Sequence, residues 1–165
     1  MPRPLSWSSG KQMSSLIRFS NASTQFPPPA ELARQDAPVE VVLPYTNAAL
    51  TAHALQALRP FVEGLHTPLT IMAVHVVPFP APLEASVGIR ARLECELAAV
   101  ARACSAPVRV SLVFARDWQQ AYLSQLPRRS LVVIAAANRW WQTREEKLAK
   151  RLAREGYAVT VIKGN

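Results

Sequence analysis

Glycine and cysteine are scarce in this chain of 165 residues, which contains five glycines and two cysteines. No glycine occurs between Gly88 and Gly156, so the middle of the chain lacks the residue that lets backbone amides approach a phosphate closely. The phosphate-loop pattern G-x4-G-K-S/T is also missing. These absences argue against an ordinary cradle for a nucleoside triphosphate.

Long apolar runs are missing too, and none approaches the roughly 20 residues of a membrane-spanning helix. Cys95 and Cys104 lie nine residues apart in one predicted helix, where they point in different directions and are not expected to pair. No metal-ligand spacing is present. This use of cysteine is typical of a reducing cytoplasm, which we take as the expected location.

The chain shows no arrangement of nucleophile, base and acid, so we expect no enzymatic activity. His53, His66 and His75 have no ligand partner at metal spacing, and we interpret them as surface or packing residues. Asp117 opens the sequence Asp-Trp-Gln-Gln, which has capping-box spacing. We therefore interpret Asp117 as a helix cap rather than a catalytic acid.

The net charge of +8 suits either an acidic partner or a solvated basic surface, and we favour the second interpretation. Five cations of the last predicted helix fall within an arc of about 120°. No nucleic-acid motif accompanies them, so nucleic acid is not the expected partner. The five are Arg144, Lys147, Lys150, Arg151 and Arg154.

Residues 1–38 are rich in proline and serine and have no clear periodicity, which predicts a disordered or linker-like tail. From residue 39 to 165 short apolar runs alternate with helical patterns, which predicts one α/β domain. Strands are predicted at 39–44, 69–77, 108–114, 130–137 and 157–162. The four helices lie between them, over 47–64, 86–104, 118–126 and 144–156, with Pro60 expected to kink or shorten the first. Alternation of this kind predicts a five-stranded parallel, doubly wound sheet.

Several segments resemble the universal stress protein family, whose order and spacing the chain follows over about residues 39–163. The resemblance implies a sheet in the order 3-2-1-4-5, in the fold also described as adenine-nucleotide alpha-hydrolase-like. It further implies a homodimer that pairs through an exposed edge of the fifth strand. The matching segments are Leu43-Pro44, Ala54-Leu55, Val74-His75-Val76-Val77-Pro78, Leu131-Val132-Val133-Ile134 and Ala158-Val159-Thr160-Val161-Ile162.

The strand order reverses between the first and fourth strands, and a ligand crevice is expected at such a reversal. ATP-binding relatives carry an aspartate after strand one and the loop G-x2-G-x9-G-S/T after strand four. Thr46 replaces the aspartate here, while Ala135 and Asn138 replace the first two glycines. We therefore expect the ATP site to be lost or remodelled and expect no cofactor. The candidate ligand-binding residues are Pro44, Tyr45, Thr46, Asn47, Ala135, Asn138, Arg139 and Trp140.

The resemblance implies a stress-response regulatory module of the type that does not bind ATP, acting through dimerisation and unidentified protein partners. Two alternatives remain open. In the first, the remodelled crevice binds a nucleotide or a small anion, held by Arg139 and the first amides of the last helix. In the second, the basic face of the last helix binds nucleic acid.

Overall fold

The computed structural model describes residues 17–20, 40–65, 67–84, 87–104, 107–138, 140 and 142–164. Its centre is a parallel sheet formed by β2 (Glu40–Pro44), β3 (Leu69–Val76), β4 (Val108–Ala115), β5 (Ser130–Ala137) and β6 (Ala158–Gly164). These five strands lie in the order β4-β3-β2-β5-β6. The predicted α/β fold with the order 3-2-1-4-5 is therefore confirmed.

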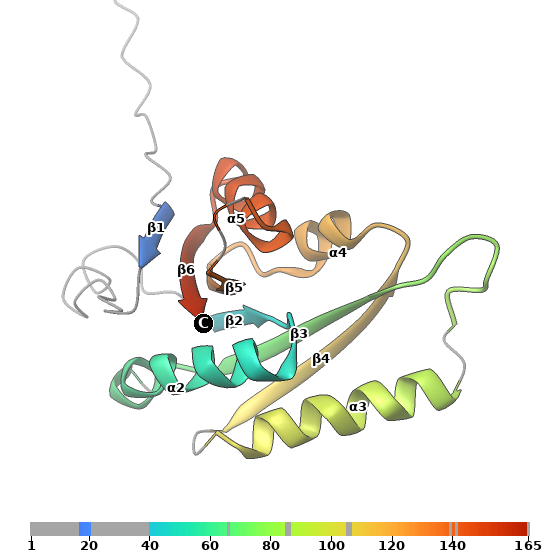
Figure 1. Ribbon diagram of the computed structural model, residues 1–165, viewed down its shortest axis with the longest axis horizontal. Helices are drawn as coiled ribbons and strands as arrows, with labels where there is room; N and C mark the ends of the chain where they lie inside the picture. The colour runs from blue at the N-terminus through green and yellow to red at the C-terminus, as the bar shows by residue number, and fades with distance from the viewer. Residues whose placement is uncertain are drawn as a thin grey trace, which may run out of the picture.

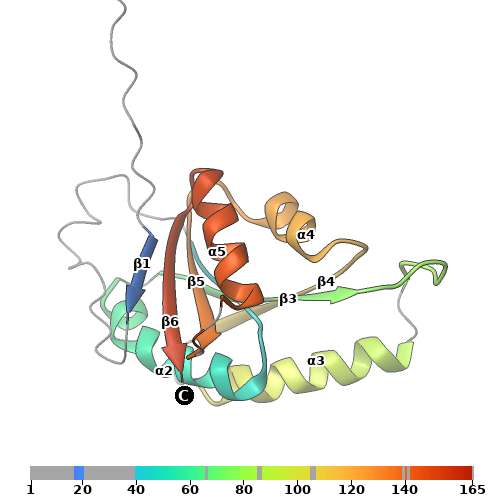
Figure 2. The same ribbon diagram turned by 45° about the horizontal axis from the view of Figure 1, so that its top comes forward.

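A sixth strand, β1 (Ile17–Ser20), pairs in parallel with β6, from Ile17 opposite Val159 to Ser20 opposite Ile162. Four residues of the predicted tail thus belong to the sheet, and the rest of residues 1–38 lie outside the described part. The expectation of an exposed edge at the fifth predicted strand is wrong over Val159–Ile162, because β1 occupies that edge (Figures 1 and 2).

Four helices connect the strands, and they cover both faces of the sheet (Figures 1 and 2). α2 (Ala48–Leu65) and α3 (Val87–Arg102) lie on one face; α4 (Trp118–Gln125) and α5 (Arg144–Arg154) lie on the other. Consecutive strand residues alternate between the faces. Leu131 and Val133 of β5 therefore pack toward α2, whereas Val132 and Ile134 pack toward α5.

Local sequence signals set most helix ends. Asn47 accepts the amide of Leu50 at the start of α2, and Asp117 accepts the amide of Gln120 at the start of α4. Gly156 has a φ of +88° directly after α5, a conformation that favours glycine. Pro60 does not shorten α2, which continues to Leu65. Burial of the next turn against the core supports this continuation, because Phe61 and Val62 are only 7% and 5% exposed.

Strands β3 and β4 remain paired beyond the end of β2. β2 pairs with β3 only up to Pro44 opposite Met72, whereas β3 and β4 remain paired as far as Val76 opposite Ala115. The last half of this ladder is therefore a two-stranded ribbon, with α3 lying along it (Figure 2). We call the described residues of 73–115 the projecting arm; they include the end of β3, the residues after it, α3 and all of β4.

Candidate functional site at the carboxyl ends of the strands

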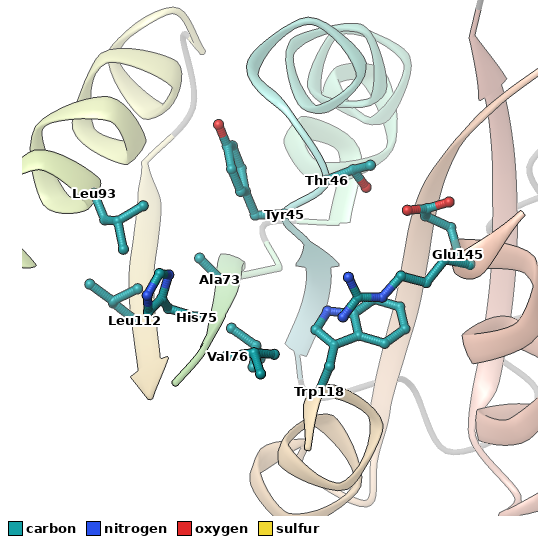
Figure 3. A pocket seen from close by; sticks show the side chains of 11 residues that line it. Tyr45, Thr46, Ala73, His75, Val76, Leu93, Leu112, Trp118 and Glu145 are labelled. Atoms are coloured by element: carbon teal, nitrogen blue, oxygen red, sulfur yellow. The ribbon is translucent and has the colours of Figure 1, made fainter. Parts of the chain in front are cut away.

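A half-open pocket of about 280 Å³, which we call the strand-end pocket, lies where β2, β3 and β4 end (Figure 3). Its polar and aromatic lining comes from four elements: the residues after β2, the end of β3, and the first residues of α4 and α5. Apolar side chains of β3, β4 and α3 form the rest of the wall. The polar and aromatic lining residues are Tyr45, Thr46, His75, Trp118, Arg144 and Glu145.

Tyr45 connects the end of β2 to β3 and to α3. Its amide donates to the carbonyl of Met72 at 2.8 Å, and its phenol donates to a carboxylate oxygen of Glu96 in α3. Burial raises the pKa of Tyr45 above its usual value, and the hydrogen bond and negative charge of Glu96 raise it further. The phenol is therefore a neutral hydrogen-bond donor and a poor general base.

Thr46 bridges the reversal point of the sheet. Its hydroxyl donates to the carbonyl of Ala135 in β5 at 3.0 Å, across the expected crevice between β2 and β5. Asn47 uses its side chain to cap α2, and Pro44 is buried at the end of β2. The Thr46 hydroxyl and the Asn47 side chain are therefore already engaged in hydrogen bonds within the protein.

The segment after β5 is also engaged internally. The amide of Asn138 donates to the carbonyl of Gly164 at 3.0 Å and so continues the β5–β6 ladder. Thr143 and Glu146 form the capping box of α5, with distances of 3.2 and 3.3 Å between their side chains and each other's amides. Two carboxylates, Glu145 and Glu146, lie in this first turn. Their negative charge already complements the helix dipole and disfavours a phosphate at the same end.

Arg144 and Trp118 are stacked at the opening of the pocket. The guanidinium carbon of Arg144 lies 4.0 Å from the centre of the Trp118 ring, close enough for a cation–π interaction. The carboxylate of Glu145 points toward Thr46 (Figure 3). A stacked cation beside an apolar wall can bind a small anion or a flat, partly apolar molecule.

His75 packs edge-to-face against Phe114, with 5.5 Å between the ring centres. Arg90 of α3 lies 4.9 Å from the centre of the Phe114 ring. The pocket lining includes neither serine nor cysteine, and its threonine hydroxyl donates to a carbonyl. Among the described lining residues, no activated nucleophile stands beside His75.

Within the described residues, no group of three or more His, Cys, Asp and Glu side chains could hold a metal ion. No helix in that part of the chain is both long and apolar enough to span a bilayer. Cys95 is exposed, Cys104 is half-buried, and both are free thiols.

Of the seven candidate residues that the structure describes, two line the pocket, Tyr45 and Thr46. Ala135 is buried and meets Thr46, whereas Trp140 is 91% exposed. Arg139 lies outside the described residues, as does Trp141.

The candidate list omitted four residues that line the pocket: His75, Trp118, Arg144 and Glu145. The list was drawn from the segments after the first and fourth predicted strands, and His75 was interpreted as a surface or packing residue. One signal could have found Trp118. It follows a third parallel strand, and the carboxyl ends of parallel strands meet at one edge.

The chain matches no protein-family model, and no curated protein is significantly similar to it in sequence. The likeness to universal stress proteins therefore rests on the segments named above and on the strand order.

Proposed function

We propose that this protein is a regulatory module of the universal stress protein type, which binds no ATP and acts through dimerisation and contacts with other proteins. The strand order supports the proposed family, since the resemblance implies that order. The two free cysteines favour a reducing, cytoplasmic environment, which we include in the proposal.

Absence of ATP binding is supported by three contacts around the crevice. Thr46 spans from β2 to β5, the amide of Asn138 is bonded to β6, and Glu145 and Glu146 occupy the first turn of α5. A triphosphate there would meet two carboxylates and would lack the closely approaching amides of a glycine-rich loop.

The distribution of exposed apolar side chains is the observation that carries the proposed protein contacts. Seven large hydrophobic side chains are exposed in the described part, and six of them belong to the projecting arm. Phe79 and Val87 are 87% and 84% exposed. Apolar exposure concentrated in one region is typical of an interaction surface. The other four on the arm are Val76, Leu83, Ile89 and Val110.

We infer that a second copy of the chain occupies this surface. β4 is an edge strand of eight residues, and it contains no proline or lysine to discourage pairing. Any edge strand can pair with its own copy in antiparallel orientation about a two-fold axis, so the interface is self-complementary. Pairing at β4 replaces the expected pairing at β6, whose edge carries β1.

Light scattering after gel filtration of the full chain tests the dimer. We expect wild type to be a dimer and Val110→Lys, which places a charge on the β4 edge, to be a monomer. Ala158→Lys is the matched control, because Ala158 is an exposed residue of β6 and the same charge is added there. A wild type that stays monomeric at high micromolar concentration, or dissociation only in Ala158→Lys, would contradict pairing at β4.

Nucleotide binding is tested separately. Acid extraction of the purified protein should release no nucleotide, and calorimetric titration with Mg-ATP should give no heat of binding. Bound nucleotide in the extract would overturn the proposed absence of ATP binding, whatever the oligomeric state.

A second candidate function is binding of a small anion in the strand-end pocket. The stacked pair of Arg144 and Trp118 favours it, because a held guanidinium loses little freedom when it binds an anion. In thermal-shift titrations with small aromatic carboxylates, Arg144→Gln should abolish any stabilisation. Arg128→Gln is the control, since Arg128 also lies over an aromatic ring, that of Tyr157 at 5.7 Å, but does not line the pocket.

A further inference from the structure

A separate concave surface lies along α5 beside α4, on the helix pair that Figures 1 and 2 show on one face of the sheet. It has a volume of about 520 Å³. Four of its lining residues are cations of α5, spaced three and four residues apart so that they form one stripe. They are Lys147, Lys150, Arg151 and Arg154, and we call this surface the α5 groove.

Most of this charge is not neutralised within the described part of the protein. Lys147, Lys150 and Arg154 form no salt bridge or side-chain hydrogen bond there. Arg151 donates to the side-chain oxygen of Gln119, a neutral partner, at 2.6 Å. Among the described residues of the lining there is a single acid, Glu155.

Helices α2 and α3 each contain an ion pair between charges one turn apart. Arg59 and Glu63 of α2 lie 2.9 Å apart, and Arg90 and Glu94 of α3 lie 3.6 Å apart, each pair one helical turn apart. In α5 the acid Glu146 instead caps the helix and pairs with Lys163 at 3.0 Å. The cations of the α5 groove therefore repel one another, and a bound polyanion would relieve that repulsion.

The lining also restricts what the groove can bind. Among the described residues, the lining includes no aromatic side chain on which a base could stack and no apolar side chain that could enter a lipid bilayer. The apolar residues of α5 are buried against the sheet: Leu148, Ala149, Leu152 and Ala153. A stripe from Lys147 to Arg154 rises by about 10 Å, which is long enough to contact several successive phosphates.

We propose that the α5 groove binds the phosphodiester backbone of nucleic acid, without reading base sequence. This property goes beyond the proposed function and uses residues that neither the dimer surface nor the strand-end pocket requires. Because such binding depends on release of counterions, it weakens with salt in proportion to the number of phosphates contacted.

The test measures fluorescence anisotropy of labelled oligonucleotides of about 20 nucleotides, single-stranded and duplex, in unrelated sequences. Four contacts predict a slope of log K against log salt of about −2.8 for single strands and −3.6 for duplex. Affinity for single strands should fall about fifty-fold between 50 and 200 mM salt. The slope of log K against log salt distinguishes binding to single strands from binding to duplex. Within each of these two forms, oligonucleotides of different sequence should bind with equal affinity.

The double variant Lys147→Gln with Lys150→Gln should bind more weakly and lower the slope for duplex by about 2. The matched control is Arg59→Gln with Arg128→Gln, two exposed cations outside the α5 groove, the projecting arm and the strand-end pocket, which removes the same charge elsewhere and should leave the slope unchanged. Far-UV circular dichroism checks that both variants fold.

Three results would overturn the proposal: no binding at about 100 µM protein in low salt, equal losses in both double variants, or a strong preference for one base sequence. Vesicles rich in phosphatidylserine provide the membrane comparison. Charge-dependent binding to vesicles in the absence of binding to either oligonucleotide would also overturn it.

Discussion

Helices α5 and α3 cover opposite faces of the same sheet, but they are buried to very different extents. α5 has 11 residues, of which five are buried, whereas α3 has 16 residues and only two, Leu97 and Val100, are buried. α5 packs over central strands that have neighbours on both sides, and α3 lies over the edge strand β4 and the two-stranded ribbon (Figure 2).

This difference in burial indicates that the α5 side contributes mainly to folding stability and that the arm is available for association. A two-stranded ribbon offers a helix little apolar surface, so the amino-terminal half of α3 remains exposed. Loss of buried contacts on the α5 side should destabilise the fold, whereas exposed contacts on the arm can change while the core stays intact. Partner contacts are therefore most easily made and broken on the arm.

The largest expected effect is on the α5 side. Leu152 is fully buried among residues of α4, β5 and β6, so Leu152→Ala should lower the free energy of unfolding by about 2–5 kcal/mol. Leu93→Ala, at a half-buried position of α3, should cost less than half as much. Urea denaturation measures both, and equal losses would contradict the comparison.

Tyr122 links the α5 side to β3 just before the arm begins, because its buried phenol donates to the carbonyl of Met72 at 3.1 Å. Tyr122→Phe removes this hydrogen bond, and because the Met72 carbonyl still accepts the amide of Tyr45, the loss should be about 1.5 kcal/mol near neutral pH. Tyr45→Phe serves as a control for loss of a phenol on the arm side.

Alkaline pH sharpens the same comparison. Burial raises the pKa of Tyr122 above its ordinary value of about 10, so the folded protein favours the neutral phenol. Its contribution to stability is complete below pH 10 and is lost as the pH rises toward the raised value. The gap between wild type and Tyr122→Phe should therefore narrow when urea denaturation is repeated above pH 10. A constant gap would contradict the assignment to Tyr122.

A smaller effect is expected where β2 meets β5. Thr46→Val removes the hydrogen bond to the carbonyl of Ala135 and should cost about 0.5–1.5 kcal/mol. Thr46→Ser retains the hydroxyl and should recover most of the loss. Thermal denaturation measures both variants, and identical losses would show that the methyl group, rather than the hydroxyl, contributes the stability.

The smallest effect is expected on the arm. Val87 is 84% exposed, so Val87→Ser should change the free energy of unfolding by no more than about 0.5 kcal/mol in dilute, monomeric protein. The same change should weaken the proposed dimer, and sedimentation velocity over a concentration series measures that. Destabilisation of the monomer by several kcal/mol would mean that α3 is held far more firmly than its burial indicates.

Local patterns predicted the elements well. The buried run Leu131–Ile134 forms a central strand, Thr143 caps α5 with both bonds of a capping box, and Gly156 follows that helix at positive φ. Each of these features depends on residues within a few positions of one another. Pro60 does not shorten α2, and burial of the turn after it supports the continuation of the helix.

The strand-end pocket was only partly predictable. Tyr45 and Thr46 lie there as expected, but Trp118, Arg144 and His75 come from other elements. Nothing near Trp118 in the sequence indicates that Arg144 will stack on it. The strand β1 was missed for the same reason, since its pairing with β6 joins residues about 140 positions apart, such as Ile17 and Val159.

By itself, the sequence determined the alternation of strands and helices, the caps, and the stripe of cations on α5. Tertiary structure alone decided which strand ends would meet, because that depends on strand order and register. The contact of Thr46 with Ala135 spans 89 residues and that of Tyr45 with Glu96 spans 51. Backbone propensities act over a few residues, whereas contacts of this range form only after the sheet has brought distant segments together.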